Sequence, residues 1–167
     1  MMNARVLIAG VLVYFLTACA SYGPLGTPEF EVAFRHDLPA IEGRLLYRGP
    51  AEAFYGVDGY RFIRWWPNWG VIALTEHRLY FVKWIRGKYE NDWELDLEKI
   101  RSVEVRALGR SSRLVINYDG EEKVTSFAVF SDASPNPGPI AFVDTQKTVR
   151  VCQLIAERSG RQCELPK

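Results

Sequence analysis

Residues 70–81 read Gly-Val-Ile-Ala-Leu-Thr-Glu-His-Arg-Leu-Tyr-Phe, and this stretch decides the expected fold. Two apolar runs, Val71–Thr75 and Arg78–Ile85, flank a short polar turn, which is the pattern of a β-hairpin. Similar runs follow at intervals of roughly eight to twelve residues, a spacing typical of an antiparallel sandwich or barrel. The further strands that we expect are 93–97, 100–107, 113–118 and 124–130.

Alternation along these runs indicates strands with one buried face. Leu114, Ile116 and Tyr118 share one face, and Asp119-Gly120 supplies a dipeptide that closes tight hairpins. A second turn of this kind is expected at 56–59, between strands at 53–55 and 60–66.

The last part of the chain changes from strands to a helix. Prolines at 135, 137 and 139 forbid regular structure, and Asp144 or Thr145 can cap a helix over 143–159 that Gly160 ends. Its apolar stripe is expected at Val151, Cys152, Ile155 and Ala156.

Two segments, 70–81 and 95–103 (Leu-Asp-Leu-Glu-Lys-Ile-Arg-Ser-Val), resemble the GRAM and bacterial pleckstrin-homology-like families. The resemblance covers residues 42–159. It implies a mainly β fold, an antiparallel PH-like or GRAM-like barrel or orthogonal sandwich of about seven strands capped by a C-terminal α-helix. We assign this domain to residues 42–167. The motifs are apolar patterns, so they imply a fold rather than a function.

The N-terminus has the pattern of an export signal. Arg5 precedes the uncharged apolar run Val6–Leu16, which at ~1.5 Å per residue is too short to span a hydrocarbon layer of about 30 Å. We therefore interpret residues 1–18 as a cleaved signal peptide.

Leu16-Thr17-Ala18-Cys19 resembles the lipobox of bacterial lipoproteins. The resemblance implies cleavage before Cys19 and attachment there of a diacylglyceryl group and a further acyl chain such as palmitate, which together anchor a protein to a membrane. The alternative is an ordinary signal-peptidase site with an incidental cysteine. In that family, Ala20 in place of Asp favours the periplasmic face of the outer membrane.

The residues after Cys19 are rich in glycine and proline. We expect 19–28 to be a flexible tether and 29–41 a connecting segment. In an exported protein, Cys152 and Cys163 are expected to form a disulfide, the alternative being two unpaired thiols. His36 and His77 lack the spacing of metal ligands, so neither a metal nor another cofactor is implied.

Charge argues against a nucleic-acid partner. The 167 residues carry 21 Lys and Arg against 20 Asp and Glu, and no nucleic-acid-binding motif is present.

The most unusual stretch is 61–69, Arg-Phe-Ile-Arg-Trp-Trp-Pro-Asn-Trp. Tryptophan and arginine together suit a binding anchor or a membrane interface, so the candidate binding surface is Arg61, Arg64, Trp65, Trp66 and Trp69. The alternative is that strand alternation buries some of these rings in the core. Trp84 and Trp93 flank a polar loop expected at 86–92, and we interpret them as a cross-strand packing pair.

The sequence contains no nucleophile elbow, His-Glu-x-x-His helix or phosphate-binding glycine loop. We therefore expect a non-catalytic binding or assembly module in the cell envelope, held by the lipid on Cys19, with a protein or lipid partner. The rival is an envelope hydrolase with an unrecognised active site, which needs a deep polar pocket. A purely structural subunit is the third hypothesis.

Overall fold

The computed structural model describes residues 22–56, 68–109, 111–120, 123–132 and 143–166. In chain order the elements are α2 (Glu29–Asp37), β1 (Tyr47–Tyr55), β2 (Trp69–Leu74), β3 (Arg78–Ile85), β4 (Lys88–Asp96), the 3₁₀ turn η1 (Leu97–Lys99), β5 (Ile100–Leu108), β6 (Ser111–Tyr118), β7 (Val124–Val129), α3 (Thr145–Ser159) and β8 (Cys163–Glu164).

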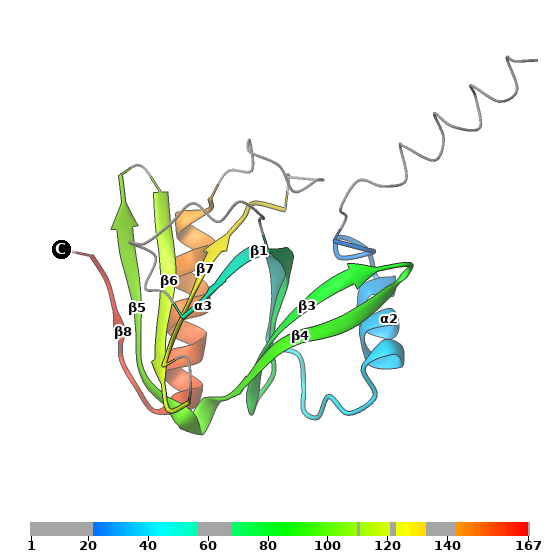
Figure 1. Ribbon diagram of the computed structural model, residues 1–167, viewed down its shortest axis with the longest axis horizontal. Helices are drawn as coiled ribbons and strands as arrows, with labels where there is room; N and C mark the ends of the chain where they lie inside the picture. Colours follow the sequence, from blue (N-terminus) through cyan, green and yellow to red (C-terminus); the bar gives the residue numbers. More distant parts are fainter. Residues whose placement is uncertain (1–21, 57–67, 110, 121–122, 133–142, 167) are drawn as a thin grey trace, which may run out of the picture.

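The strands form a single sheet in the order β4-β3-β2-β1-β7-β6-β5-β8. Neighbouring strands are antiparallel, except that β8 runs parallel to β5. The first strand, β1, lies in the middle of the sheet, between β2 and β7, and the sheet is open, with β4 and β8 as its edge strands (Figure 1). The expected mainly β fold with a C-terminal helix is confirmed.

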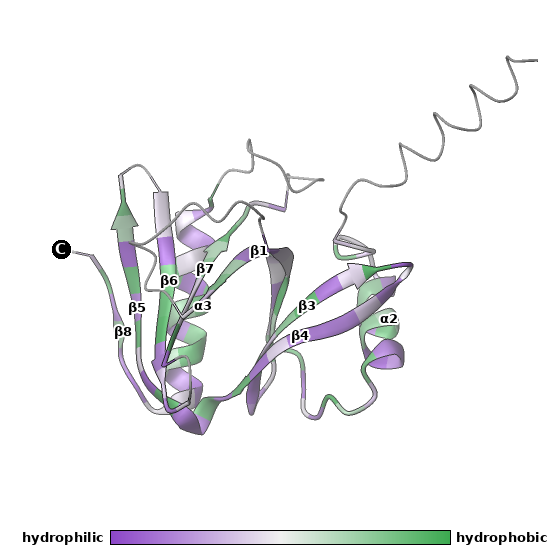
Figure 2. Ribbon diagram, in the orientation of Figure 1, coloured by the Kyte–Doolittle hydropathy of each residue, from purple (hydrophilic) through white to green (hydrophobic). Residues whose placement is uncertain are grey.

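Helix α3 covers the face of β5, β6 and β7 (Figure 1). The Asp144 carboxylate accepts a hydrogen bond from the Lys147 amide at 3.0 Å, and Gly160 ends the helix in the left-handed conformation. The predicted apolar stripe of α3 packs against Leu114, Ile116 and Tyr118 of β6 in one buried cluster, the inner core. Figure 2 shows hydrophobic and hydrophilic positions alternating around α3 and along the strands beside it. The local patterns were therefore interpreted correctly for this inner core.

A second apolar cluster, here called the outer cluster, lies on the opposite face of the sheet, under α2 and the residues that precede it. We call this face of the sheet the outer face. Phe30 and Phe34 of α2 are almost fully buried, and Tyr22 and Leu25 pack with them. Described residues of the segments expected as a flexible tether (19–28) and a connecting segment (29–41) thus pack on the domain, and α2 lies within the second of these segments. Periodicity missed α2 because its apolar residues are few and its burial depends on the β3–β4 hairpin. None of the described helices is long and apolar enough to cross a bilayer.

The hairpin of β3 and β4 corrects a second expectation. Residues 86–92 do not form a loop, because β4 begins at Lys88 and only Arg86 and Gly87 make the turn. Both have positive φ, 51° and 84°, as a tight hairpin turn requires. Strand β1 is also longer than expected and pairs with β2 and β7. The strand expected at 60–66 lies outside the described residues.

Trp84 and Trp93 do not pack against each other. Trp84 is paired with Tyr89 and lies in the outer cluster, with the two ring centroids 4.8 Å apart. Trp93 is paired with Phe81 and packs in the inner core against Tyr55, with ring centroids 6.0 Å apart. A bulge between these two sites changes the register, so the two rings point to opposite faces of the sheet.

Candidate binding sites

Four residues of the predicted binding surface, Arg61, Arg64, Trp65 and Trp66, lie outside the described residues. The fifth, Trp69, is the first residue of β2. It is half-buried, stands opposite Glu52 of β1 and packs against the outer cluster. Trp69 therefore belongs to the outer cluster. The described ends of the connection between β1 and β2 are Gly56 and Asn68.

A network around Asp92 joins the strand ends that carry this connection. The Asp92 carboxylate accepts hydrogen bonds from Tyr55 Oη at 2.7 Å, Asn68 Nδ2 at 3.3 Å and Lys83 Nζ at 2.5 Å. Tyr55 ends β1 and Asn68 directly precedes β2, so one carboxylate holds both ends of the 56–68 connection. Asp92 was expected in a loop; it lies instead at the β4 bulge, which turns its side chain towards these partners.

Burial alone would raise the pKa of Asp92. The hydrogen bonds from Lys83, Tyr55 and Asn68 outweigh that effect and hold the pKa below its ordinary value of 3.8. Asp92 therefore stays ionised at neutral pH and acts as a fixed acceptor that orders the strand ends.

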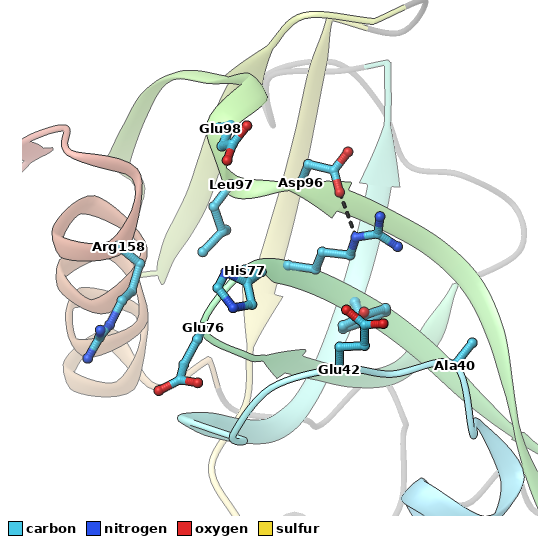
Figure 3. Close-up of a pocket in the computed structure, with 10 residues that line it drawn as sticks. Ala40, Glu42, Glu76, His77, Asp96, Leu97, Glu98 and Arg158 are labelled. Carbon is cyan, nitrogen blue, oxygen red and sulfur yellow. Dashed lines mark ion pairs between the residues drawn. The ribbon is translucent and has the colours of Figure 1, made fainter.

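A polar groove of about 500 Å³, which shares no lining residue with this network, lies between the β2–β3 turn, η1 and the end of α3. Figure 3 shows His77 in its centre, with Arg158 of α3 on one side and Glu42 on the other. The groove is lined by Ala40, Glu42, Glu76, His77, Arg78, Tyr80, Asp96, Leu97, Glu98 and Arg158. Carboxylates outnumber guanidinium groups in this lining.

Two of the charges in the groove are bound to each other. Arg78 Nε lies 2.6 Å from Asp96 Oδ1, and Lys99 Nζ lies 2.8 Å from the other oxygen of Asp96. The hydrogen bond from Lys99, together with the charge of Arg78, lowers the pKa of Asp96, and Asp96 in turn raises the pKa of Arg78. Both groups therefore keep their charge, so this pair supplies a fixed polar surface rather than a proton donor or acceptor. Within the described residues, no group of three His, Cys, Asp or Glu side chains could hold a metal ion.

A third polar cluster lies on the outer face of β1, β7 and β6, and the sequence analysis missed it. The Arg113 guanidinium lies 4.1 Å above the Phe54 ring, and its buried Nε and Nη1 have no hydrogen-bond partner among the described residues. Ser126 Oγ is also buried, and no described residue bonds to it. Burial raises the pKa of Glu52, an effect that the charge of Arg113 partly offsets, and burial lowers the pKa of Arg113. In sequence, Glu52 and Arg113 look like the solvated positions of alternating strands, so no local signal identifies them.

The two remaining cysteines form a disulfide, as predicted. Cys152 in α3 and Cys163 in β8 have an S–S distance of 2.03 Å and Cα atoms 5.5 Å apart. The bond ties β8 to the helix and so holds it beside β5.

No protein-family model matches this sequence, and no curated protein matches it. The similarity to the GRAM family noted at 70–81 therefore stays an expectation.

Solved structures give a likeness of fold. The hSac2 domain of the human phosphoinositide phosphatase Sac2 has a TM-score of 0.52 at 8% identity, over 100% of this chain and 92% of that one. The DH/PH fragment of PDZRHOGEF, solved with human RhoA, has a TM-score of 0.47 at 12% identity over 70% of this chain. A structure of the Vav1 exchange factor that concerns its PH and C1 domains has a TM-score of 0.48 at 12% identity over 71% of this chain.

This chain spans only 29% of the PDZRHOGEF chain and 26% of the Vav1 chain. At such identities the similarity bears on the fold and not on activity or partners. The strand order, the helix on β5–β7 and the likeness to the hSac2 domain together show that the domain is mainly β, with an open sheet and a C-terminal helix.

Proposed function

We propose that this chain is a cell-envelope lipoprotein, anchored by lipid on Cys19 to the periplasmic face of the outer membrane, whose PH-like domain is a non-catalytic module that binds a protein partner. The export signal and the lipobox-like sequence at 16–19 support the anchor. The fold supports a binding module, because PH-like domains present loops from a rigid sheet.

The Asp92 network is the observation that carries the module hypothesis. It fixes Tyr55 and Asn68, the two positions from which the chain leaves and re-enters the sheet around the Arg/Trp-rich stretch. A binding loop is most effective when the scaffold holds its ends in one geometry, because less conformational entropy is then lost on binding. The carboxylate supplies that constraint here.

The binding surface is tested by crosslinking in native membranes, followed by purification of the full-length lipidated protein. The Trp65→Ala, Trp66→Ala double variant is compared with Leu165→Ala, which changes an exposed apolar residue elsewhere. We expect one crosslinked protein to be lost only from the double variant, while its thermal unfolding curve stays as in the wild type. Retention of every crosslinked protein by the double variant would place the binding surface elsewhere.

The anchor is tested separately by mass spectrometry of the N-terminal peptide and by the variant Cys19→Ser. We expect acyl mass on Cys19 and loss of membrane association in the variant. An unmodified Cys19 in the membrane fraction contradicts the lipoprotein assignment.

Among the described residues, the polar groove around His77 is the site on which we test the hydrolase hypothesis. It predicts hydrolysis of a chromogenic ester or phosphoester that His77→Ala abolishes and Arg150→Asn, a change to an exposed residue of α3, leaves intact. The fixed Arg78–Asp96 pair makes the binding role the better supported one.

A further inference from the structure

The first described residues lie on the end of the β3–β4 hairpin. Tyr89 Oη donates a hydrogen bond of 2.8 Å to the Tyr22 carbonyl oxygen. The backbone of Gly23 rests against the Trp84 ring, since a Cβ built on this glycine would lie 2.6 Å from two ring atoms. Figure 1 shows this start of the chain beside the turn of the hairpin. The entry of the chain and the hairpin end thus form one packed unit.

This contact leaves very little chain between the domain and the proposed lipid. Cys19 precedes Tyr22 by three residues, and three extended residues span at most about 10 Å. The headgroup layer of one leaflet is roughly 5–8 Å thick. A lipid on Cys19 therefore brings this part of the domain to the headgroups, because no long tether separates them.

The hairpin end has the side chains that such a position favours. Ile85, Arg86, Gly87 and Lys88 are all exposed, with 37% of Ile85 accessible to solvent. Arg86 makes no ion pair with any described residue, and Lys88 Nζ lies 3.2 Å from a carboxylate oxygen of Glu90. An exposed apolar side chain beside cations, above a tryptophan, suits the boundary between acyl chains and anionic headgroups.

Acidic groups lie on the neighbouring helix. The first turn of α2 carries Glu29 and Glu31, and Glu31 Oε1 lies 3.2 Å from Arg35 Nε. These carboxylates would be repelled by anionic headgroups, which leaves the hairpin turn as the favoured point of contact.

We propose that the hairpin end, Ile85–Lys88, rests on the bilayer surface next to the anchor and makes a second contact with lipid. The inference depends on the proposed lipidation of Cys19. It also orients the domain: Arg78 is at the other end of β3, about 23 Å away at ~3.3 Å per residue. The groove around Arg78 and His77 then faces away from the bilayer, where a partner can reach it.

The test uses the full-length lipidated protein in vesicles of phosphatidylcholine with phosphatidylglycerol. The photoreactive residue p-benzoylphenylalanine replaces Ile85 in one sample and Leu165 in the other. Leu165 is the matched control because it is 52% exposed and directly follows β8, which lies on the opposite side of the molecule from the end of the β3–β4 hairpin (Figure 1). After irradiation, lipid adducts are counted by mass spectrometry.

We expect lipid adducts at position 85 and none at position 165. Equal yields at both positions, or none at 85 in a protein whose Cys19 carries lipid, overturn the proposed contact and leave the lipoprotein assignment intact. An unmodified Cys19 in the same spectra overturns both. The two failures are therefore distinguishable in a single sample.

Charge is tested with Arg86→Asn, because asparagine tolerates the positive φ of this turn position. We expect this change to lower the adduct yield at position 85 about fivefold, the effect of one basic residue at an anionic surface. Arg150→Asn in α3 is the control and should leave the yield unchanged. A yield that Arg86→Asn does not alter would show that the cation is not part of the contact.

Discussion

The phenolic oxygen of Tyr89 donates a hydrogen bond of 2.8 Å to the backbone carbonyl of Tyr22, joining residues 67 positions apart. Tyr89 is 1% exposed, and burial raises its pKa, so the hydroxyl keeps its proton across the physiological range. The Tyr89 amide also donates to Asp37 Oδ2 at 2.8 Å, at the far end of α2. One residue thus holds both ends of the N-terminal region to the hairpin.

Tyr89→Phe should weaken the attachment of residues 22–28 while keeping the ring. A buried carbonyl loses its donor, so the free energy of unfolding should fall by about 1 kcal/mol. Hydrogen exchange followed by mass spectrometry should show faster exchange in 22–28 than in β6. Unchanged exchange in both segments would mean that packing of Phe30 and Phe34 alone holds the N-terminal region.

Asp92→Asn should destabilise the domain at neutral pH by roughly 1–2 kcal/mol, because hydrogen bonds to a charged acceptor are stronger than those to an amide. The folded state lowers the pKa of Asp92, so its contribution is fully present above the ordinary value of 3.8 and is lost as the pH falls through the folded-state pKa. Urea unfolding of wild type and variant should therefore differ at pH 7 and converge as the pH falls below 3.8. A difference that stays constant over this range would rule out the charge of Asp92 as the cause.

Gly70→Ala tests why a glycine begins the β2–β3 hairpin sequence at residues 70–81. A Cβ there would lie 2.8 Å from the Phe81 ring and would also press on the Val82 carbonyl oxygen. Because Gly70 is buried between paired strands, this overlap should cost about 1–3 kcal/mol of stability. Gly26→Ala is the control, since no atom lies within 4 Å of its added Cβ. Thermal unfolding should show a lower Tm for Gly70→Ala only. Equal Tm values for the two variants would mean that β2 and β3 move apart enough to accommodate the added methyl group without cost.

Removal of the disulfide by Cys152→Ala with Cys163→Ala should lower the unfolding free energy by about 2–3 kcal/mol, because the bond closes a loop of 11 residues. The parallel pairing of β8 with β5 should be lost first, since only Val103–Cys163 and Glu104–Glu164 form it. Reductant should lower the Tm of the wild type and leave that of the variant unchanged. A wild-type Tm that does not respond to reductant would show that the helix and the Arg161 contact to Ile100 suffice.

Local patterns sufficed for most elements. Alternation predicted the buried face of β6, and the cap at Asp144 with the stop at Gly160 predicted α3. The pairing of the two cysteines followed from the expectation that the chain is exported. Each of these rests on neighbours within a few residues, or on chemistry that has only one partner available.

Other features depended on contacts between distant parts of the chain. The position of β1 between β2 and β7, the turn of Asp92 towards Tyr55, the burial of Arg113 and the packing of Tyr22 carry no local signal. Backbone geometry sets the periods of strands and helices, so the local sequence is enough to identify which residues alternate, cap and pair. Which face each strand turns towards α2 or α3 depends on long-range contacts, because burial of a polar side chain depends on what covers it and not on its neighbours in sequence.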